Sequence, residues 1–183
     1  MNIFGDLKMD CAIYKTSYNS PLGEIILHSN VENLTALYFN ETNENAARFC
    51  ESQNLSIFTE TKQWLDLYFS GENPQWTPKI ALPKNASVFA LRVWEILQSV
   101  PYGKTTTYGA IAKQIAREFG LPKMSAQAVG GAVSRNPIAI IIPCHRVIGA
   151  NGNLTGYAGG IENKIALLKI EGIATNHLKM PKI

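Results

Sequence analysis

The chain has 183 residues, of which 46% are hydrophobic and 17% are charged, and its formal net charge at pH 7 is +3. This balance is typical of a folded protein with one or two domains and excludes an intrinsically disordered chain. No apolar run approaches the length of a membrane span, and the charged N-terminus lacks the apolar core of a signal peptide, so we expect a cytoplasmic protein.

The first part of the chain predicts a strand meander followed by helices. Alternating or β-branched residues, separated by turn-forming residues, predict strands over 13–18, 24–28 and 34–39. Apolar residues at helical spacing predict helices over 43–50 and 59–69.

A proline-rich linker follows these elements. Prolines occur at positions 74, 78 and 83. We place a domain boundary near residue 83, which divides the chain into domains of residues 1–83 and 84–183.

Beyond the linker the sequence predicts a mainly helical domain. Helices are expected over 86–99, between the Thr105–Thr107 run and Gly120, over 126–133 and over 161–171. The second and third of these surround a short turn, and Ser125 can cap the third, which suggests a helix-turn-helix.

The predicted helix over 126–133 carries unusually small side chains. Gly130 and Gly131 each cost about 1 kcal/mol relative to alanine, so helix stability does not explain them. We expect a close approach of a second backbone, either from another part of the protein or from the sugar-phosphate rim of a duplex. Apart from Gln127 the helix lacks long base-reading side chains, so DNA binding would be nearly independent of sequence.

Charge is distributed unevenly along the chain. Residues 1–100 carry seven Lys/Arg and eleven Asp/Glu, whereas residues 101–150 carry six Lys/Arg and one acidic residue. Such a basic block favours a polyanionic partner, nucleic acid first. A solvated basic face without a partner is the alternative.

The cysteine count bears on redox state and metal binding. The three cysteines, Cys11, Cys50 and Cys144, are an odd number without framework spacing, which indicates reduced thiols in an intracellular protein. No CxxC pair or His/Cys cluster indicates a metal site.

The most informative segment is the apolar run that ends in Pro143-Cys144-His145-Arg146. Residues 138–142 predict a buried strand closed by a proline, which places the thiol at a strand end. A thiol reacts as thiolate, and a pKa of about 8.5 leaves only a few per cent ionised at neutral pH. The positive charge of Arg146 would lower this pKa, whereas His145 needs a bridging water or a turn to reach the sulfur. The alternative is a buried structural cysteine beside a polar turn.

Two further features follow the cysteine. Residues 156–160, Gly-Tyr-Ala-Gly-Gly, predict a loop that can offer backbone amides to a ligand. Glu171 ends the last predicted helix, where the helix dipole disfavours a carboxylate. We therefore expect a cationic or imidazole partner, with His145 as the candidate, and an exposed glutamate is the alternative.

These segments together resemble the O6-alkylguanine-DNA alkyltransferases, also called methylated-DNA–protein-cysteine methyltransferases. The resemblance rests on Asn136-Pro137, Pro143–Val147 and Gly156–Gly160, covers roughly residues 85–175, and continues weakly into Ser20–Gly23. It implies an α+β fold, with an N-terminal ribonuclease H-like α/β domain followed by a mainly helical winged helix-turn-helix domain.

The resemblance implies direct repair of DNA. Cys144 is expected to take the alkyl group from O6-alkylguanine once and irreversibly, after the nucleotide is flipped out of the duplex. Whether O4-alkylthymine is also accepted stays open. The expected partner is double-stranded DNA containing alkylated guanine, bound by a monomer that needs no cofactor and no membrane.

The resemblance also assigns catalytic roles. The catalytic set is Cys144, His145, Glu171, Asn136, Tyr108 and Lys164. His145 and Glu171 match a water-linked relay that removes the thiol proton, and Asn136 matches the residue that shapes the turn carrying the cysteine. Tyr108 and Lys164 match groups that supply hydrogen bonding and a proton toward guanine N3.

A second set is assigned to binding of DNA and substrate. It consists of Ser125, Gln127, Ala128, Arg135, Arg146, Tyr157, Ala158 and Gly159. Gln127 stands where many relatives carry an arginine that fills the space of the flipped base. Ala158 replaces a serine of some relatives and leaves its backbone N–H as the contact for O6. Arg146 is also expected to have a structural role, by pairing with another residue near the site.

Some relatives bind structural zinc through N-terminal residues. Only Cys11 matches that set here, and Asn30 and Thr35 stand where ligands are required. His28 nearby is not enough for a closed site of four ligands, so we predict no metal.

Two other functions compete with repair. A damage sensor would flip alkylguanine without accepting the group, but such relatives lack the cysteine that this chain has at position 144. A hydrolase dyad of Cys144 and His145 is disfavoured because adjacent side chains of an extended segment point to opposite faces.

Overall fold

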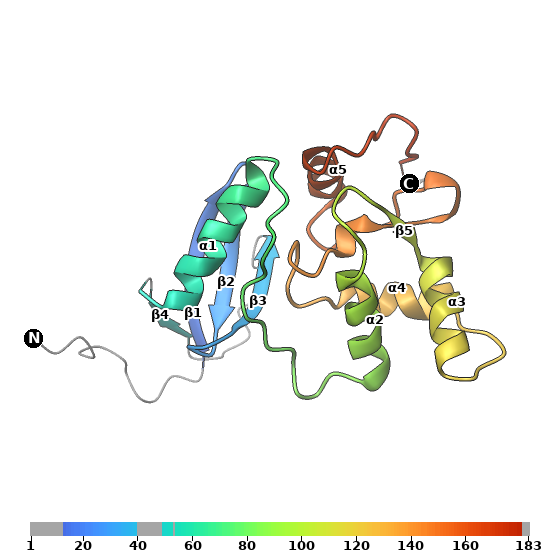
Figure 1. Ribbon diagram of the computed structural model, residues 1–183, viewed down its shortest axis with the longest axis horizontal. Helices are drawn as coiled ribbons and strands as arrows, with labels where there is room; N and C mark the ends of the chain where they lie inside the picture. Colours follow the sequence, from blue (N-terminus) through green and yellow to red (C-terminus); the bar gives the residue numbers. More distant parts are fainter. Residues whose placement is uncertain (1–12, 40–48, 53, 181–183) are drawn as a thin grey trace, which may run out of the picture.

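The computed structural model describes residues 13–39, 49–52 and 54–180. Figure 1 shows a sheet covered by one helix, formed by the first part of the chain, beside a group of helices formed by the rest. The expected α+β fold is therefore confirmed. Among the described helices, none combines the length and the apolar character that a membrane span needs.

The N-terminal sheet has four strands in the order β3-β2-β1-β4. The predicted meander is confirmed, with antiparallel strands β1 (Ile13–Ser20), β2 (Gly23–Ser29) and β3 (Leu34–Phe39). Strand β4 (Phe49–Glu51) pairs with β1 in parallel. The helix predicted over 43–50 is thus wrong at residues 49 and 50, and the rest of it lies outside the described residues. Pairing with β1 decides the conformation of so short a segment, because its own helical period is weak.

The cysteines differ from their expected state. Cys50 is disulfide-bonded, whereas Cys144 is a free thiol. The prediction of reduced thiols throughout is therefore wrong at Cys50, because spacing along the chain does not reveal which cysteines a fold brings together.

Helix α1 (Ser56–Phe69) covers one face of the sheet (Figure 1). It begins three residues before the predicted start at residue 59. Phe58, Leu65 and Tyr68 of this helix are completely buried. A buried tyrosine hydroxyl requires a polar partner, so the hydroxyl of Tyr68 must find one inside the molecule.

The four helices predicted beyond the linker are confirmed, with small shifts at their ends. They are α2 (Val88–Gln98), α3 (Tyr108–Glu118), α4 (Ala126–Ser134) and α5 (Ile161–Ile170). The side chains of Ser87, Thr107 and Ser125 cap α2, α3 and α4 by accepting backbone N–H groups of the first turn. Helices α3 and α4 contact each other, in agreement with the predicted helix-turn-helix.

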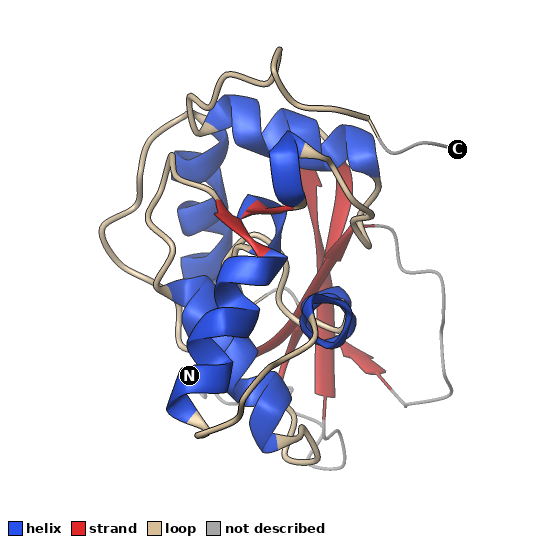
Figure 2. Ribbon diagram, turned by 90° about the vertical axis from the view of Figure 1, so that its right-hand side faces the viewer, coloured by secondary structure: helices blue, strands red, loops and turns tan. Residues whose placement is uncertain are grey.

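A second, very small sheet lies among these helices. Strands β5 (Thr106–Thr107) and β6 (Val147–Ile148) pair in parallel and are visible as short arrows between the helices in Figure 2. This pairing brings the start of α3 beside the segment that follows Cys144.

The apolar run before Cys144 is buried, but it is not the predicted strand. Ile142 N donates to Ile138 O at 3.0 Å, and Ile140 adopts a left-handed φ of 66°. The run therefore folds into tight turns. An unbroken apolar run predicts that a segment is buried, but it has no alternation of apolar and polar residues that would identify its secondary structure. The sequence therefore could not distinguish turns from a strand.

Backbone pairing joins the two parts of the molecule. Leu37 N of β3 donates to Pro137 O, and Ala139 N donates to Leu37 O, both at 3.0 Å. The turn that precedes Cys144 is thereby attached to the edge of the N-terminal sheet.

Candidate active site

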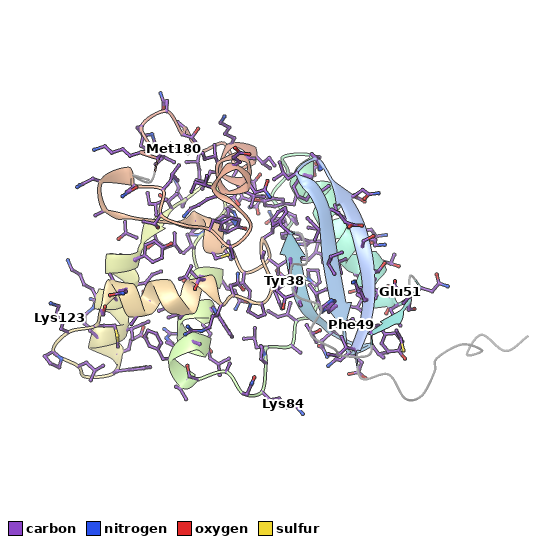
Figure 3. All side chains as sticks on the ribbon, turned by 180° about the vertical axis from the view of Figure 1, so that it is seen from behind. Tyr38, Phe49, Glu51, Lys84, Lys123 and Met180 are labelled. Atoms are coloured by element: carbon purple, nitrogen blue, oxygen red, sulfur yellow. The ribbon has the colours of Figure 1, made fainter. Side chains whose placement is uncertain are left out.

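A cavity of about 460 Å³ lies between the sheet and the C-terminal helices, and Cys144 lines it. Tyr108 of α3 and Gly130 of α4 line it from the helical side. Tyr38 and Phe49, both labelled in Figure 3, line it from the sheet. Its volume lies in the usual range for small-molecule pockets. The thiol is only 7% exposed, yet it opens on this cavity beside the small-residue helix, so the arrangement does not favour a sealed structural cysteine.

The turn that carries Cys144 is held by Asn136. Asn136 Nδ2 donates to Ile142 O at 2.7 Å, and its Oδ1 accepts from Ile138 N at 3.0 Å. Cys144 then begins the short 3-10 helix η1 (Cys144–Arg146). One amide therefore fixes the backbone that presents the sulfur.

His145, Arg146 and Glu171 form a buried network behind the thiol. His145 Nε2 donates to Glu171 Oε1 at 2.6 Å, and neither side chain is accessible to solvent. Arg146 Nε lies 2.9 Å from Glu171 Oε2. The expected imidazole partner of Glu171 is confirmed, and a guanidinium is added to it. Burial raises the pKa of Glu171, but the hydrogen bonds and charges of His145 and Arg146 outweigh it and lower the pKa to about 2.

The network fixes which ring nitrogen of His145 can accept a proton. A carboxylate only accepts hydrogen bonds, so Nε2 carries the hydrogen and Nδ1 keeps its lone pair. Nδ1 is buried and has no hydrogen-bond partner among the described residues. Burial lowers the pKa of His145, and Glu171 offsets this only in part. The imidazole is therefore neutral near pH 7 and able to take up a proton.

Arg146 does not line the cavity, although it was expected in the binding set. Its guanidinium is buried against Glu171 and donates from Nη1 to Val100 O at 2.6 Å. Burial raises the pKa of the Cys144 thiol, against a hydrogen bond from Asn136 and the positive charge of Lys164. The expected lowering of this pKa by Arg146 is not found, because Glu171 neutralises the guanidinium.

Tyr108 and Lys164 take different positions around the thiol. Tyr108, the first residue of α3, lines the cavity, and burial raises the pKa of its hydroxyl. Lys164 is buried outside the cavity lining, where Nζ donates to Val147 O at 2.7 Å and to Thr155 O at 3.3 Å. Burial lowers the pKa of Lys164 to about 8. Lys164 thus joins the segment after Cys144 to the start of the following loop.

The predicted loop over 156–160 forms one wall of the cavity, and Tyr157, Ala158 and Gly159 all line it. A Cβ atom on Gly159 would lie 2.8 Å from the Tyr157 ring and 2.9 Å from the Phe39 ring. Asn163 Nδ2 also donates to Gly159 O at 2.9 Å. Only glycine fits here, and the loop is held against strand β3 of the N-terminal sheet.

The binding residues expected on α4 and around its ends are solvent-exposed. They are Ser125, Gln127, Ala128 and Arg135. The expected approach of a second protein backbone to this helix is not found: a Cβ atom on Gly130 would meet the Tyr108 ring at 3.8 Å, and one on Gly131 would meet Arg135 Nη1 at 3.5 Å. Gly130 thus faces the side chain of Tyr108 from α3, whereas the side of α4 that carries Gly131 meets only the Arg135 side chain at the end of the same helix.

Tyr68 is a contact of the site that the sequence did not reveal. Its hydroxyl donates to Glu171 Oε1 at 2.8 Å and lies 3.3 Å from His145 Nε2. In the sequence Tyr68 belongs to the apolar face of a helix and indicates only a core position. The one available signal was chemical, because a buried hydroxyl must find a partner.

The N-terminal sheet shows no metal centre in its described part. Among residues 13–39, 49–52 and 54–180, no group of three or more His, Cys, Asp or Glu could hold a metal ion. His28 packs against the rings of Tyr38 and Phe49. Cys11 lies outside the described residues.

Two sequence models of one family match consecutive parts of the chain. The model described as "6-O-methylguanine DNA methyltransferase, ribonuclease-like domain" matches residues 13–80. The model described as "6-O-methylguanine DNA methyltransferase, DNA binding domain" matches residues 88–173.

Curated relatives and solved structures are similar over nearly the whole chain. The methylated-DNA–protein-cysteine methyltransferase of Methanosarcina acetivorans is 44% identical over 87% of this chain and 99% of its own. That of Mycobacterium tuberculosis is 42% identical over 87% of this chain and 92% of its own. The crystal structure of the Mycobacterium tuberculosis O6-methylguanine methyltransferase has a TM-score of 0.75 at 37% identity, covering 91% of this chain and 95% of that one. A crystal structure of the same organism's enzyme in complex with DNA has a TM-score of 0.74 at 37% identity, covering 90% and 94%.

Proposed function

The chain belongs to the 6-O-methylguanine DNA methyltransferase family, and from this premise we propose that its Cys144 removes the alkyl group from O6-alkylguanine in DNA. The observation that carries this assignment is a free thiol that opens on a cavity beside α4, with the buried His145–Glu171 pair behind it. The protein is a methyltransferase that uses its own cysteine as acceptor and therefore acts once.

The open face of α4 is the surface proposed to meet the duplex. Gln127, Gly131 and Arg135 follow one another at intervals of four residues and so share one side of the helix. Small side chains there allow the sugar-phosphate backbone to come close, and Arg135 can pair with a phosphate. Contacts of this kind position DNA without reading its sequence.

The modified base must leave the stack to reach the thiol. Flipping costs a few kcal/mol, and a side chain that fills the vacated space offsets part of this cost. We assign that role to Gln127, which lies exposed near the start of α4. The extruded guanine then enters the cavity between α4 and the loop over 156–160.

Transfer requires that the thiol first lose its proton. Burial raises the pKa of Cys144, so the thiol is protonated before substrate binds. The unprotonated Nδ1 of His145 is the atom that would accept the thiol proton. A single water between Sγ and Nδ1 would carry the proton, and Glu171 would stabilise the imidazolium that results.

The thiolate then attacks the alkyl carbon in line with the bond to O6. The new S–C bond forms as the C–O6 bond breaks, and the electron pair stays on the purine. The Tyr108 hydroxyl lines the cavity and can donate a hydrogen bond to the leaving base, and the backbone N–H of Ala158 can do so at O6. The thioether product is stable, so no thiolate is regenerated.

The duplex is proposed to be bound by a monomer, without metal or organic cofactor, in the cytoplasm. The proposed chemistry supports the absence of a metal or cofactor, because a thiolate and two hydrogen-bond donors suffice for alkyl transfer.

One experiment tests the proposed function. The protein is incubated with a duplex carrying O6-methylguanine with a radiolabelled methyl group, and label is counted on protein, on DNA and in small molecules. Repair predicts up to one equivalent of label on the wild-type protein and none on Cys144→Ala, which should still bind DNA. Binding without transfer would indicate a damage sensor, and release of labelled small molecules over many turnovers would indicate a hydrolase.

A further inference from the structure

Tyr68 connects the N-terminal part of the molecule to the proton relay. It belongs to α1, which packs on the sheet, yet its hydroxyl donates to Glu171 Oε1 at 2.8 Å. The same carboxylate oxygen accepts from His145 Nε2 at 2.6 Å. The tyrosine is completely buried, so water does not compete for these contacts.

The hydroxyl of Tyr68 stays a donor over the whole working pH range. Burial raises its pKa well above the ordinary value, and the negative charge of Glu171 raises it further. The ring is fixed in place by stacking on Trp64 and by edge contacts with Phe69 and Tyr102. These ring contacts therefore hold the hydroxyl of Tyr68 in one direction, toward Glu171 and His145.

We propose that Tyr68 is a positioning residue of the alkyl-transfer reaction, which tunes the proton affinity of His145 by sharing the carboxylate oxygen that His145 uses. This inference rests on the alkyl transfer proposed above. It gives the N-terminal part of the molecule a direct role in the chemistry of Cys144.

The direction of the effect follows from the distances. A hydrogen bond from Tyr68 withdraws negative charge from Glu171 Oε1 and so weakens its support for a protonated His145. The Tyr68 oxygen also lies 3.3 Å from His145 Nε2, where it supports the protonated ring. The 2.8 Å donation is the shorter contact and decides the sign. Removing the hydroxyl should make His145 hold its proton more strongly.

Other charged and titratable groups face the relay and stay unchanged in this comparison. They are Arg146 and Cys144 of η1, Lys164 of α5, Tyr102 of the segment between α2 and β5, and Tyr157 of the loop over 156–160. Tyr102 offers a matched control, because its hydroxyl also joins the two parts of the molecule but donates only to the carbonyls of Gly71 and Ile170.

The test compares the pH dependence of the single-turnover transfer rate in wild type, Tyr68→Phe and Tyr102→Phe, with a duplex carrying O6-methylguanine. The transfer rate should fall at low pH, where His145 becomes protonated, and this fall is the acidic limb of the profile. For Tyr68→Phe we expect the acidic limb to move to higher pH by about half a unit, so that transfer at a given pH on this limb is roughly threefold slower. The rate at high pH should equal that of wild type. Tyr102→Phe should keep the wild-type profile.

The other outcomes overturn the proposal. They are an unchanged profile for Tyr68→Phe, a shift to lower pH, an equal shift in Tyr102→Phe, or a rate that falls equally at every pH. Transfer by the wild-type protein in the same assay tests the proposed function separately. Should Tyr68→Phe fold poorly, 3-fluorotyrosine at position 68 keeps the hydroxyl and makes it a stronger donor, so the acidic limb should move to lower pH, and an unmoved limb would refute the role.

Discussion

At Cys144 the surroundings decide the chemistry. Burial alone makes the thiol a weaker acid, which protects it from unspecific oxidation and alkylation. In the proposed reaction, the neutral imidazole of His145 takes up the thiol proton, and the positive charge of Lys164 lowers the pKa of the thiol against the effect of burial. Arg146 stands only two residues after Cys144 in the sequence, yet its guanidinium pairs with Glu171. Proximity along the chain is therefore a poor guide to which cation acts on the sulfur.

The buried carboxylate should make stability depend on pH in a definite direction. The pKa of Glu171 falls from 4.5 to about 2 on folding, so its contribution to stability is present above pH 4.5 and is lost as the pH falls toward 2. Glu171→Gln should lower the free energy of unfolding at pH 7 by about 3 kcal/mol, because Arg146 stays buried without a counter-charge. Urea unfolding at pH 7 and pH 3 measures both effects.

A matched control for this prediction is Glu118→Gln. Glu118 also pairs with an arginine, Arg92, but on the surface, where solvent screens the pair. Its loss should change stability little. Equal losses in the two variants, or an unchanged acid sensitivity of Glu171→Gln, would contradict the buried network.

At the scale of elements, α4 carries two glycines, Gly130 and Gly131, that make the helix less stable than alanine would. Its glycines meet only side-chain atoms at ordinary contact distances, so alanine fits at both positions. No packing reason for these glycines is found within the protein. For Gly131, on the open face of the helix, the proposed approach of a duplex would supply a reason.

Gly131→Ala should therefore separate helix stability from DNA binding. We expect a gain of up to about 1 kcal/mol in the free energy of unfolding, because glycine is the weaker helix former, together with weaker duplex binding. Gly130→Ala is the control, since its methyl group would point to the Tyr108 ring at 3.8 Å instead of the open face. Denaturant unfolding and fluorescence anisotropy with duplex DNA measure the two effects. Unweakened binding by Gly131→Ala would place the DNA elsewhere.

A substitution at Gln127 gives a second test of the proposed role of α4. Gln127→Arg introduces a charged side chain at the position proposed to fill the space of the flipped base, and should speed transfer from lesions that flip poorly. Single-turnover rates on a mismatched and a fully paired O6-methylguanine duplex would show the larger gain on the paired one. Equal rates on every duplex would mean that Gln127 does not occupy the vacated space.

The elements differ in how well the sequence predicts them. Helices with clear caps, such as α3 after Thr107 and α4 after Ser125, were predicted almost to the residue, because capping and periodicity are local. Strand β4 and the turns over 138–142 were not, because partners far along the chain determine them. At the site, the pair of Glu171 with His145 was predicted from a helix end, whereas Tyr68 contributes from another part of the fold.

At the scale of the whole molecule, the two parts share backbone pairing, a cavity and the buried hydrogen-bond network of Tyr68, His145 and Glu171. The Leu37 contacts attach the turn before Cys144 to the sheet, and Tyr68 reaches the relay from α1. The N-terminal part is thus more than a support for the helices, because it determines the surroundings of the reacting groups.

This coupling predicts one cooperative unfolding transition. Trp64 lies in α1, Trp94 in α2 and Trp76 in the segment between them, so Trp64→Phe and Trp94→Phe, each combined with Trp76→Phe, leave a single tryptophan in a different part of the molecule. Thermal transitions followed by fluorescence in each variant should coincide with the loss of helical circular dichroism of that variant. Two separate transitions would show that the parts fold independently.

The central claim is that one thiol, Cys144, becomes the permanent carrier of the alkyl group. The most direct measurement is peptide mass spectrometry of the protein after reaction with excess duplex containing O6-methylguanine. The account predicts one added methyl group on the peptide that contains Cys144, none on the peptide that contains Cys50, and an equal amount of repaired guanine in the DNA. Repaired guanine without a methylated Cys144 peptide, or methyl groups on another residue, would contradict it.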